Sequence, residues 1–144
     1  MDIEPGISED YLPMDPKRLL QRLHTALNSR DLENLVRCFQ VDYESVELAH
    51  PGSEFTGLSK LGEYWEQVFR DVPDFQAGLL DYTIEADMIW SEWHWHGGQE
   101  GDQAMDRVGV IIFRVEDGLI ASGRQYMEDV RPSGAGSVGG DKEP

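Results

Sequence analysis

The sequence predicts one α+β domain in which a cone-shaped, curved antiparallel sheet wraps around three N-terminal helices. Two observations predict this fold class. Apolar residues recur at helical spacing in the first half, whereas turn residues divide the second half, from residue 76 to residue 130, into four long strands. Helices that precede an antiparallel meander typically pack on one face of its sheet. A bent sheet of this kind leaves a concave, mostly apolar cavity, where small ligands bind.

The chain length favours a single domain with its own core. It has 144 residues, of which 40% are hydrophobic. We expect the domain to span residues 15–130. Residues 1–14 are predicted to be a flexible acidic extension. Residues 131–144 are predicted to be a disordered Gly/Ser-rich tail, because they hold too few apolar side chains to order themselves.

The first two helices follow each other closely. Asp15 is a suitable N-cap, and Pro16 fits the first helical position. The apolar residues of this helix are Leu19, Leu20, Leu23, Ala26 and Leu27. Asp31 can cap a second helix, whose predicted apolar stripe is Leu32, Leu35, Val36 and Phe39.

A short strand, a loop and a third helix come next. The strand is predicted over residues 43–49, and the loop at 50–57 contains proline and glycine. The third helix covers about residues 58–70 and ends before Pro73, which disfavours helix in the residue before it. Its inward residues are predicted to be Leu61, Tyr64, Trp65, Val68 and Phe69.

Four strands complete the domain, near residues 76–86, 88–96, 107–116 and 119–130. Asp117 and Gly118 stand between two apolar runs. This dipeptide is typical of a two-residue hairpin, because a type I′ turn requires positive φ at both central residues. A glycine-rich, acidic turn at residues 97–103 separates the second and third of these strands.

Charge and composition exclude several classes of partner. The chain has 28 acidic and 12 basic residues, a formal net charge of −16. A surface this negative repels nucleic acids and anionic membranes. No apolar run approaches the ~20 residues of a membrane span, and the acidic start does not resemble a secretion signal, so we expect a cytoplasmic protein. Cys38 is the single cysteine and is expected to fill core space.

Several short motifs carry a family resemblance. They are Arg-Leu-His-Thr-Ala-Leu-Asn at 22–28, Asp-Leu at 31–32, His-Pro-Gly-Ser-Glu at 50–54, and the final hairpin with Phe-Arg-Val-Glu-Asp-Gly-Leu-Ile at 113–120 and Arg-Gln-Tyr-Met at 124–127. The chain resembles the nuclear transport factor 2-like superfamily, which includes ketosteroid isomerases, SnoaL-like polyketide cyclases and limonene epoxide hydrolases. The resemblance covers roughly residues 16–130 and implies the cone-shaped fold, which hosts many activities.

The resemblance to the isomerases implies a changed set of catalytic groups. Leu23 stands where their first helix carries a tyrosine that donates to the oxyanion. His50, before Pro51, stands where they carry the general-base aspartate. Ile111 stands where they carry a second, protonated aspartate. Authentic ketosteroid isomerisation is therefore not expected, and His50 becomes the main candidate base because imidazole titrates near neutral pH.

Gln125 is the second candidate carried over by resemblance. It takes the place of the aspartate on the last strand of the epoxide hydrolases, and the polyketide cyclases also use an acidic residue with a histidine. An amide can orient a ligand or stabilise an oxyanion, but it cannot move a proton. Gln125 is therefore expected to position the substrate.

Glu92, His94 and His96 form one row of a predicted strand, because alternate residues share a face. Such a row can serve as an acid/base pair, bind a metal or face solvent. Simple alternation sends Trp93 and Trp95 to the core and the histidines outward, but a one-residue slip would exchange the faces. Glu92 and His94 therefore stay candidate catalytic residues, and no metal is expected.

The predicted function is general acid/base catalysis without a cofactor on an apolar small molecule, as an isomerase, cyclase, dehydratase or epoxide hydrolase. A binding protein with the same cavity, or a dimerisation module, is the alternative. The residues expected to line the pocket are Leu23, Tyr64, Trp65, Trp93, Trp95, Ile111, Phe113 and Met127. Their aromatic rings favour an apolar, cyclic ligand. A homodimer through the outer face of the sheet is also expected, motivated by Trp90.

Overall fold

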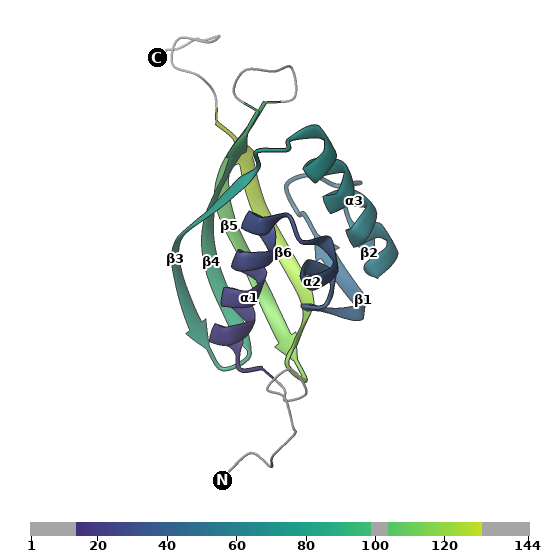
Figure 1. Ribbon diagram of the computed structural model, residues 1–144. Helices are drawn as coiled ribbons and strands as arrows, with labels where there is room; N and C mark the ends of the chain where they lie inside the picture. The colour runs from purple at the N-terminus through teal and green to yellow at the C-terminus, as the bar shows by residue number, and fades with distance from the viewer. Residues whose placement is uncertain (1–13, 99–103, 131–144) are drawn as a thin grey trace, which may run out of the picture.

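A computed structural model describes residues 14–98 and 104–130 (Figure 1). The predicted extension over residues 1–14 lies outside these residues except for Met14. The predicted tail over residues 131–144 and most of the glycine-rich turn also lie outside them. The elements follow the predicted order, with one short strand added. They are α1 (Pro16–Ser29), α2 (Leu32–Val36), β1 (Phe39–Val46), β2 (Phe55–Thr56), α3 (Leu58–Asp71), β3 (Gln76–Glu85), β4 (Met88–Gly97), β5 (Met105–Glu116) and β6 (Leu119–Asp129).

The described strands form one curved sheet in the order β2-β1-β6-β5-β4-β3. From β3 to β6 each strand pairs antiparallel with the next, which confirms the predicted meander. β1 pairs with β6 in parallel, whereas the expectation was an antiparallel sheet. A parallel pair needs a long crossover connection, and here α3 and the first three strands of the meander supply it. Figure 1 shows the helices together on one face of the curved sheet.

Helix α1 begins and ends for local reasons. The carboxylate of Asp15 accepts a hydrogen bond from the backbone N–H of Arg18 at 2.8 Å, and Pro16 occupies the first turn, as predicted. The helix stops at Arg30, which adopts a left-handed conformation with φ of 52°. Its buried residues are the predicted stripe of Leu19, Leu20, Leu23, Ala26 and Leu27.

The second helix is shorter than predicted, because Phe39 belongs to β1. Helical spacing placed Phe39 on the helix, but the main chain turns toward β6, where the N–H of Ile120 donates to the carbonyl of Cys38 at 2.8 Å. Phe39 pairs with Ile120 in register and is 6% exposed. Long-range pairing therefore overrides the local pattern, and the strand spans residues 39–46 instead of 43–49.

In strand β4 the structure shows which row of side chains faces the core, a question that the sequence left open. Ile89, Ser91, Trp93 and Trp95 are buried, whereas their alternating neighbours are exposed or half-buried. Simple alternation is thus correct, and the aromatic row faces the helices. The turn at Asp117 and Gly118 has φ values of 52° and 77°, as the predicted hairpin requires.

One core fills the space between the concave face of the sheet and the helices. Cys38 lies in it with no exposed surface and a free thiol. Burial raises the pKa of this thiol to about 12, so the side chain behaves as a small apolar group. In residues 14–98 and 104–130, the longest helices have 14 residues and none is long and apolar enough to span a membrane.

Candidate active site

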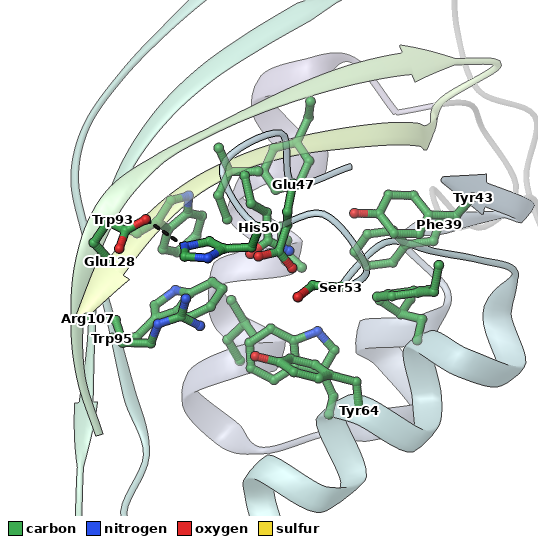
Figure 2. A pocket seen from close by; sticks show the side chains of 18 of the residues that line it. Phe39, Tyr43, Glu47, His50, Ser53, Tyr64, Trp93, Trp95, Arg107 and Glu128 are labelled. Atoms are coloured by element: carbon green, nitrogen blue, oxygen red, sulfur yellow. Dashed lines mark hydrogen bonds and ion pairs between the residues drawn. The ribbon is translucent and has the colours of Figure 1, made fainter. Parts of the chain in front are cut away.

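A cavity of about 480 Å³ opens between the concave face of the sheet and the helices. Its walls come from α1, α3, β1, the loop after β1, and β4 to β6 (Figure 2). A volume of this size suits a small organic molecule. The cavity has an apolar interior and a polar side formed by the loop at residues 47–53 and the end of β6.

The apolar wall is built from tightly packed aromatic rings. Trp65 of α3 and Trp95 of β4 meet edge to face, with ring centroids 5.2 Å apart. Trp93 is fixed by its indole N–H, which donates to the hydroxyl of Ser91 at 2.8 Å. That hydroxyl in turn donates to the carbonyl of Ile111 at 2.7 Å. This chain of hydrogen bonds holds the Trp93 ring rigidly against the cavity.

Trp95 differs from Trp93 in the hydrogen bonding of its indole N–H. Its Nε1 is buried and has no hydrogen-bond partner among the described residues. An unmade hydrogen bond of a buried donor costs about 1–3 kcal/mol. The apolar wall therefore contains one donor without an acceptor.

His50 and Glu128 form the central polar pair of the cavity. The imidazole Nε2 lies 2.7 Å from the Glu128 carboxylate (Figure 2). The two side chains are 47% and 61% exposed, so the pair contributes little to stability, about 0–1 kcal/mol. A carboxylate at this distance orients the imidazole through the ring N–H.

Glu128 reaches the cavity because β6 extends beyond its parallel neighbour. The pairing of β1 with β6 ends at Val46 and Arg124. The loop that carries His50 then lies beside the unpaired edge of β6, which accounts for the contact. Alternation alone assigns Glu128 to the outer row of the strand, since Gln125 and Asp129 line the cavity. Sequence reasoning therefore missed this residue.

Two tyrosines bring hydroxyl groups to the cavity. Tyr43 of β1 is 2% exposed, and Figure 2 shows its hydroxyl directed into the cavity. Burial raises the pKa of the Tyr43 phenol well above its usual range, and the charge of Glu47 adds to the shift. Tyr43 thus remains a hydrogen-bond donor at any physiological pH. The sequence analysis missed both Tyr43 and Glu47.

Tyr64 of α3 lies at the mouth of the cavity beside Arg107. Burial raises the pKa of the Tyr64 phenol, the guanidinium of Arg107 opposes the shift, and the carboxylate of Glu47 adds to it. Arg107 donates to the carbonyl of Met127 at 3.1 Å and lies 3.5 Å from the carboxylate of Asp129. An arginine paired with a carboxylate therefore stands at the mouth of the cavity.

The structure brings most of the predicted site residues together. His50 and Gln125 line the same cavity as seven of the predicted pocket residues, which are Leu23, Tyr64, Trp65, Trp93, Trp95, Ile111 and Phe113. The positions of the three isomerase catalytic groups, now Leu23, His50 and Ile111, therefore converge on one cavity. Met127 is an exception. It is buried in the core at 2% exposure and is not among the residues that line the cavity.

Glu92 and His94 lie on the opposite face of the sheet, so the structure corrects their placement in the pocket. Their row is the exposed one of β4. His94 instead contacts Asp106 at 2.7 Å, and its ring lies 4.7 Å from that of His96. In the part of the chain that the structure describes, no three His, Cys, Asp or Glu side chains are arranged to hold a metal ion.

Comparison with solved structures supports the fold independently. A candidate SnoaL-like polyketide cyclase from Jannaschia sp. CCS1 has a TM-score of 0.67 at 16% identity, covering 85% of this chain and 92% of that protein. A candidate ketosteroid isomerase from Kribbella flavida has a TM-score of 0.65 at 18% identity, covering 80% and 78%. A protein from Catenulispora acidiphila with a ketosteroid isomerase-like fold, bound to trimethylamine, has a TM-score of 0.65 at 14% identity, covering 78% and 86%.

Comparison with known sequences identifies the family. No curated protein matches the chain significantly. The model of the SnoaL-like domain family matches residues 20–123, which include most of α1, all of α2 and α3, and most of the sheet. This range holds most of the cavity wall, although Gln125, Glu128 and Asp129 follow it. The protein is therefore a member of the SnoaL-like domain family, with the nuclear transport factor 2-like fold.

Proposed function

We propose that this protein is a cofactor-free enzyme that acts by general acid/base chemistry on an apolar small molecule. The observation that carries the proposal is the pair formed by His50 and Glu128, 2.7 Å apart on the polar side of an aromatic cavity. Histidine is the side chain best suited to move protons near neutral pH, and a carboxylate behind it is the usual orienting group.

The shape of the cavity supports a specific kind of substrate. Rings of Trp65, Trp93, Trp95 and Phe113 provide flat apolar walls, which suit a cyclic or polycyclic molecule. The polar groups lie on one side, so a substrate would place a carbonyl, hydroxyl or epoxide oxygen there. Isomerases, cyclases, dehydratases and epoxide hydrolases all act on such substrates.

Each polar residue then has a role. His50 transfers the proton, and Glu128 holds the imidazole in position. The amide of Gln125 and the hydroxyl of Tyr43, both on the cavity wall, can donate hydrogen bonds to the substrate oxygen. Leu23 and Ile111 are apolar, so the oxyanion would be stabilised by a different set of donors from that of the ketosteroid isomerases.

The test is proton relocation in a small cyclic ketone. Cyclohex-3-enone isomerises to its conjugated isomer, whose ultraviolet absorbance rises as the reaction proceeds. We expect His50→Ala to lower the rate by at least about 100-fold, because the proton carrier is removed. His94→Ala is the matched control, since it lies on the outer face and should retain the full rate. Equal rates for the two variants would contradict the proposal.

Binding without turnover is the second candidate. The apolar residues Leu23 and Ile111, at positions where the isomerases carry acids, favour it. Trp65 and Trp95 line the cavity, so a ligand there should quench tryptophan fluorescence. Quenching by cyclohex-3-enone with no isomerisation would support this alternative.

We also propose that the protein is a homodimer that works in the cytoplasm. The outer face of the sheet carries exposed apolar side chains, with Trp90 45% exposed, Val108 39% and Tyr126 38%. These three residues lie on adjacent strands, β4, β5 and β6, and large exposed apolar surfaces often mark protein contacts. The free, buried thiol of the single cysteine suits a reducing compartment.

A further inference from the structure

Among the described residues, Glu47 is the carboxylate of the cavity wall that has no hydrogen-bond or ion-pair partner. Three carboxylates of these residues line the cavity, and the other two have partners. Glu128 contacts His50 at 2.7 Å, and Asp129 lies 3.5 Å from Arg107. The Glu47 side chain forms no hydrogen bond or ion pair with any residue in the described ranges. It is only partly exposed, so its charge is incompletely hydrated.

The Glu47 side chain lines the cavity. Burial raises the pKa of the phenols of Tyr43, on β1, and Tyr64, on α3, and the charge of Glu47 adds to both shifts, which agrees with a position near both rings. In the view of Figure 2 the Glu47 side chain extends into the cavity between His50 and Tyr43, with Ser53 beside it.

We propose that Glu47 is a second proton-transfer residue, which accepts a proton from a substrate carbon while His50 donates one to the substrate oxygen. This inference rests on the proposed function and narrows it. A carboxylate that is not neutralised by a neighbour can only accept a proton, whereas an imidazolium held by Glu128 can donate one. Acid and base then stand in one cavity, which suits enolisable ketones.

The proposed step conserves atoms and charge. Glu47 takes the proton from the carbon next to the carbonyl group. The electron pair of the broken C–H bond forms a C=C bond, the C=O bond becomes a single bond, and its oxygen receives the proton of the His50 imidazolium. The product is an enol, with Glu47 protonated and His50 neutral. Transfer of the Glu47 proton to another carbon, with return of the enol O–H proton to His50, completes an isomerisation. In a cyclisation the enol carbon attacks a second carbonyl group, whose oxygen takes the proton of Glu47 while the enol O–H proton returns to His50.

A substrate that needs only the accepting step tests Glu47 separately from His50. In 5-nitrobenzisoxazole a base removes the proton on the ring carbon and the C–H electrons form a nitrile. The N–O bond breaks, and its electrons form a coloured phenolate that leaves without an acid. We expect Glu47→Gln to lower the rate by at least about 100-fold, whereas His50→Ala has a much smaller effect.

The matched control is Glu44→Gln, at an exposed glutamate of β1 that stands three residues before Glu47 and does not line the cavity. It should keep the full rate. If Glu47→Gln does not fold, as judged by circular dichroism, Glu47→Ala replaces it, and added acetate should restore its rate but not that of Glu44→Ala. A rate for Glu47→Gln equal to that of Glu44→Gln would overturn the role of Glu47, whether or not the unaltered protein is active. The assay of His50→Ala on cyclohex-3-enone would still decide the proposed function.

Discussion

The position of the Tyr43 hydroxyl depends on the absence of a side chain at Gly123. Tyr43 packs edge to face against Phe39, with ring centroids 4.7 Å apart, and the ring of Phe55 lies 6.1 Å away. A Cβ atom at Gly123 would lie 2.6 Å from the Tyr43 hydroxyl oxygen. The glycine is therefore required by space, and it allows the phenol to lie against the sheet with its hydroxyl toward the cavity.

We predict that Gly123→Ala destabilises the protein by about 1–3 kcal/mol, the usual cost of overpacking a core. The cost should fall in a Tyr43→Phe background, because the clashing oxygen is then gone. Denaturant unfolding of the two single variants and the double variant measures the difference. The same cost in both backgrounds would show that the Tyr43 hydroxyl is not the atom that excludes a side chain.

Among the elements, strand β4 determines how the two faces of the sheet are used. Its aromatic row forms part of the cavity wall, and its other row carries Trp90, Glu92 and the two histidines to the outer face. The exposed Trp90 stands near Val108 and Tyr126 of the neighbouring strands. The proposed homodimer contact would cover this half-exposed indole.

We predict that Trp90→Glu converts the proposed homodimer to a monomer, because a charge would be buried at the contact. Val41→Glu is the control. Val41 is 75% exposed on β1, which lies toward the opposite edge of the sheet from β4, and its variant should remain dimeric. Light scattering at micromolar concentration measures the mass of each. A monomeric unaltered protein would contradict the prediction directly.

At the scale of the whole molecule, the burial of an uncharged thiol and two uncharged phenols makes the free energy of unfolding depend on pH in the alkaline range. Burial raises the pKa of the Cys38 thiol from 9.0 to about 12, and it raises the pKa of the Tyr43 and Tyr64 phenols above 10.0. Each group binds its proton more tightly in the folded than in the unfolded chain. Its contribution is complete below the unfolded pKa and is lost as pH rises toward the folded pKa.

We therefore predict that the free energy of unfolding decreases steadily as pH rises from about 9 to about 12. These two limits are the ordinary pKa of the Cys38 thiol and its pKa in the folded protein. Tyr43→Phe should reduce this dependence above pH 10.0, because it removes the most buried phenol. Tyr82→Phe, at a residue 38% exposed on β3, is the control and should follow the unaltered protein. Denaturant unfolding at a series of pH values measures the slopes. Parallel slopes for Tyr43→Phe and the unaltered protein would contradict the prediction.

Much of the candidate site could be predicted because its residues lie in regular elements. Trp93 and Trp95 follow strict alternation on a strand, and Trp65 follows helical spacing, so their inward orientation is a local property. Glu92 and His94 were candidates because the register of that strand was open. The long-range pairing of β4 with β3 and β5 resolved it, and no local pattern could.

By itself the sequence determined the fold class, the start of α1 at Asp15 and Pro16, the turn at Asp117 and Gly118, and the aromatic wall. These features follow from capping, turn geometry and periodicity, which act over a few residues. Only the tertiary structure decided that Phe39 begins a strand, that Glu128 contacts His50, and that Glu47 lines the cavity with no ion-pair partner among the described residues. The reason is that β1 lies parallel to β6 and ends before it, which brings residues nearly 80 positions apart, at 50 and 128, into contact. Such contacts depend on how the whole chain closes on itself.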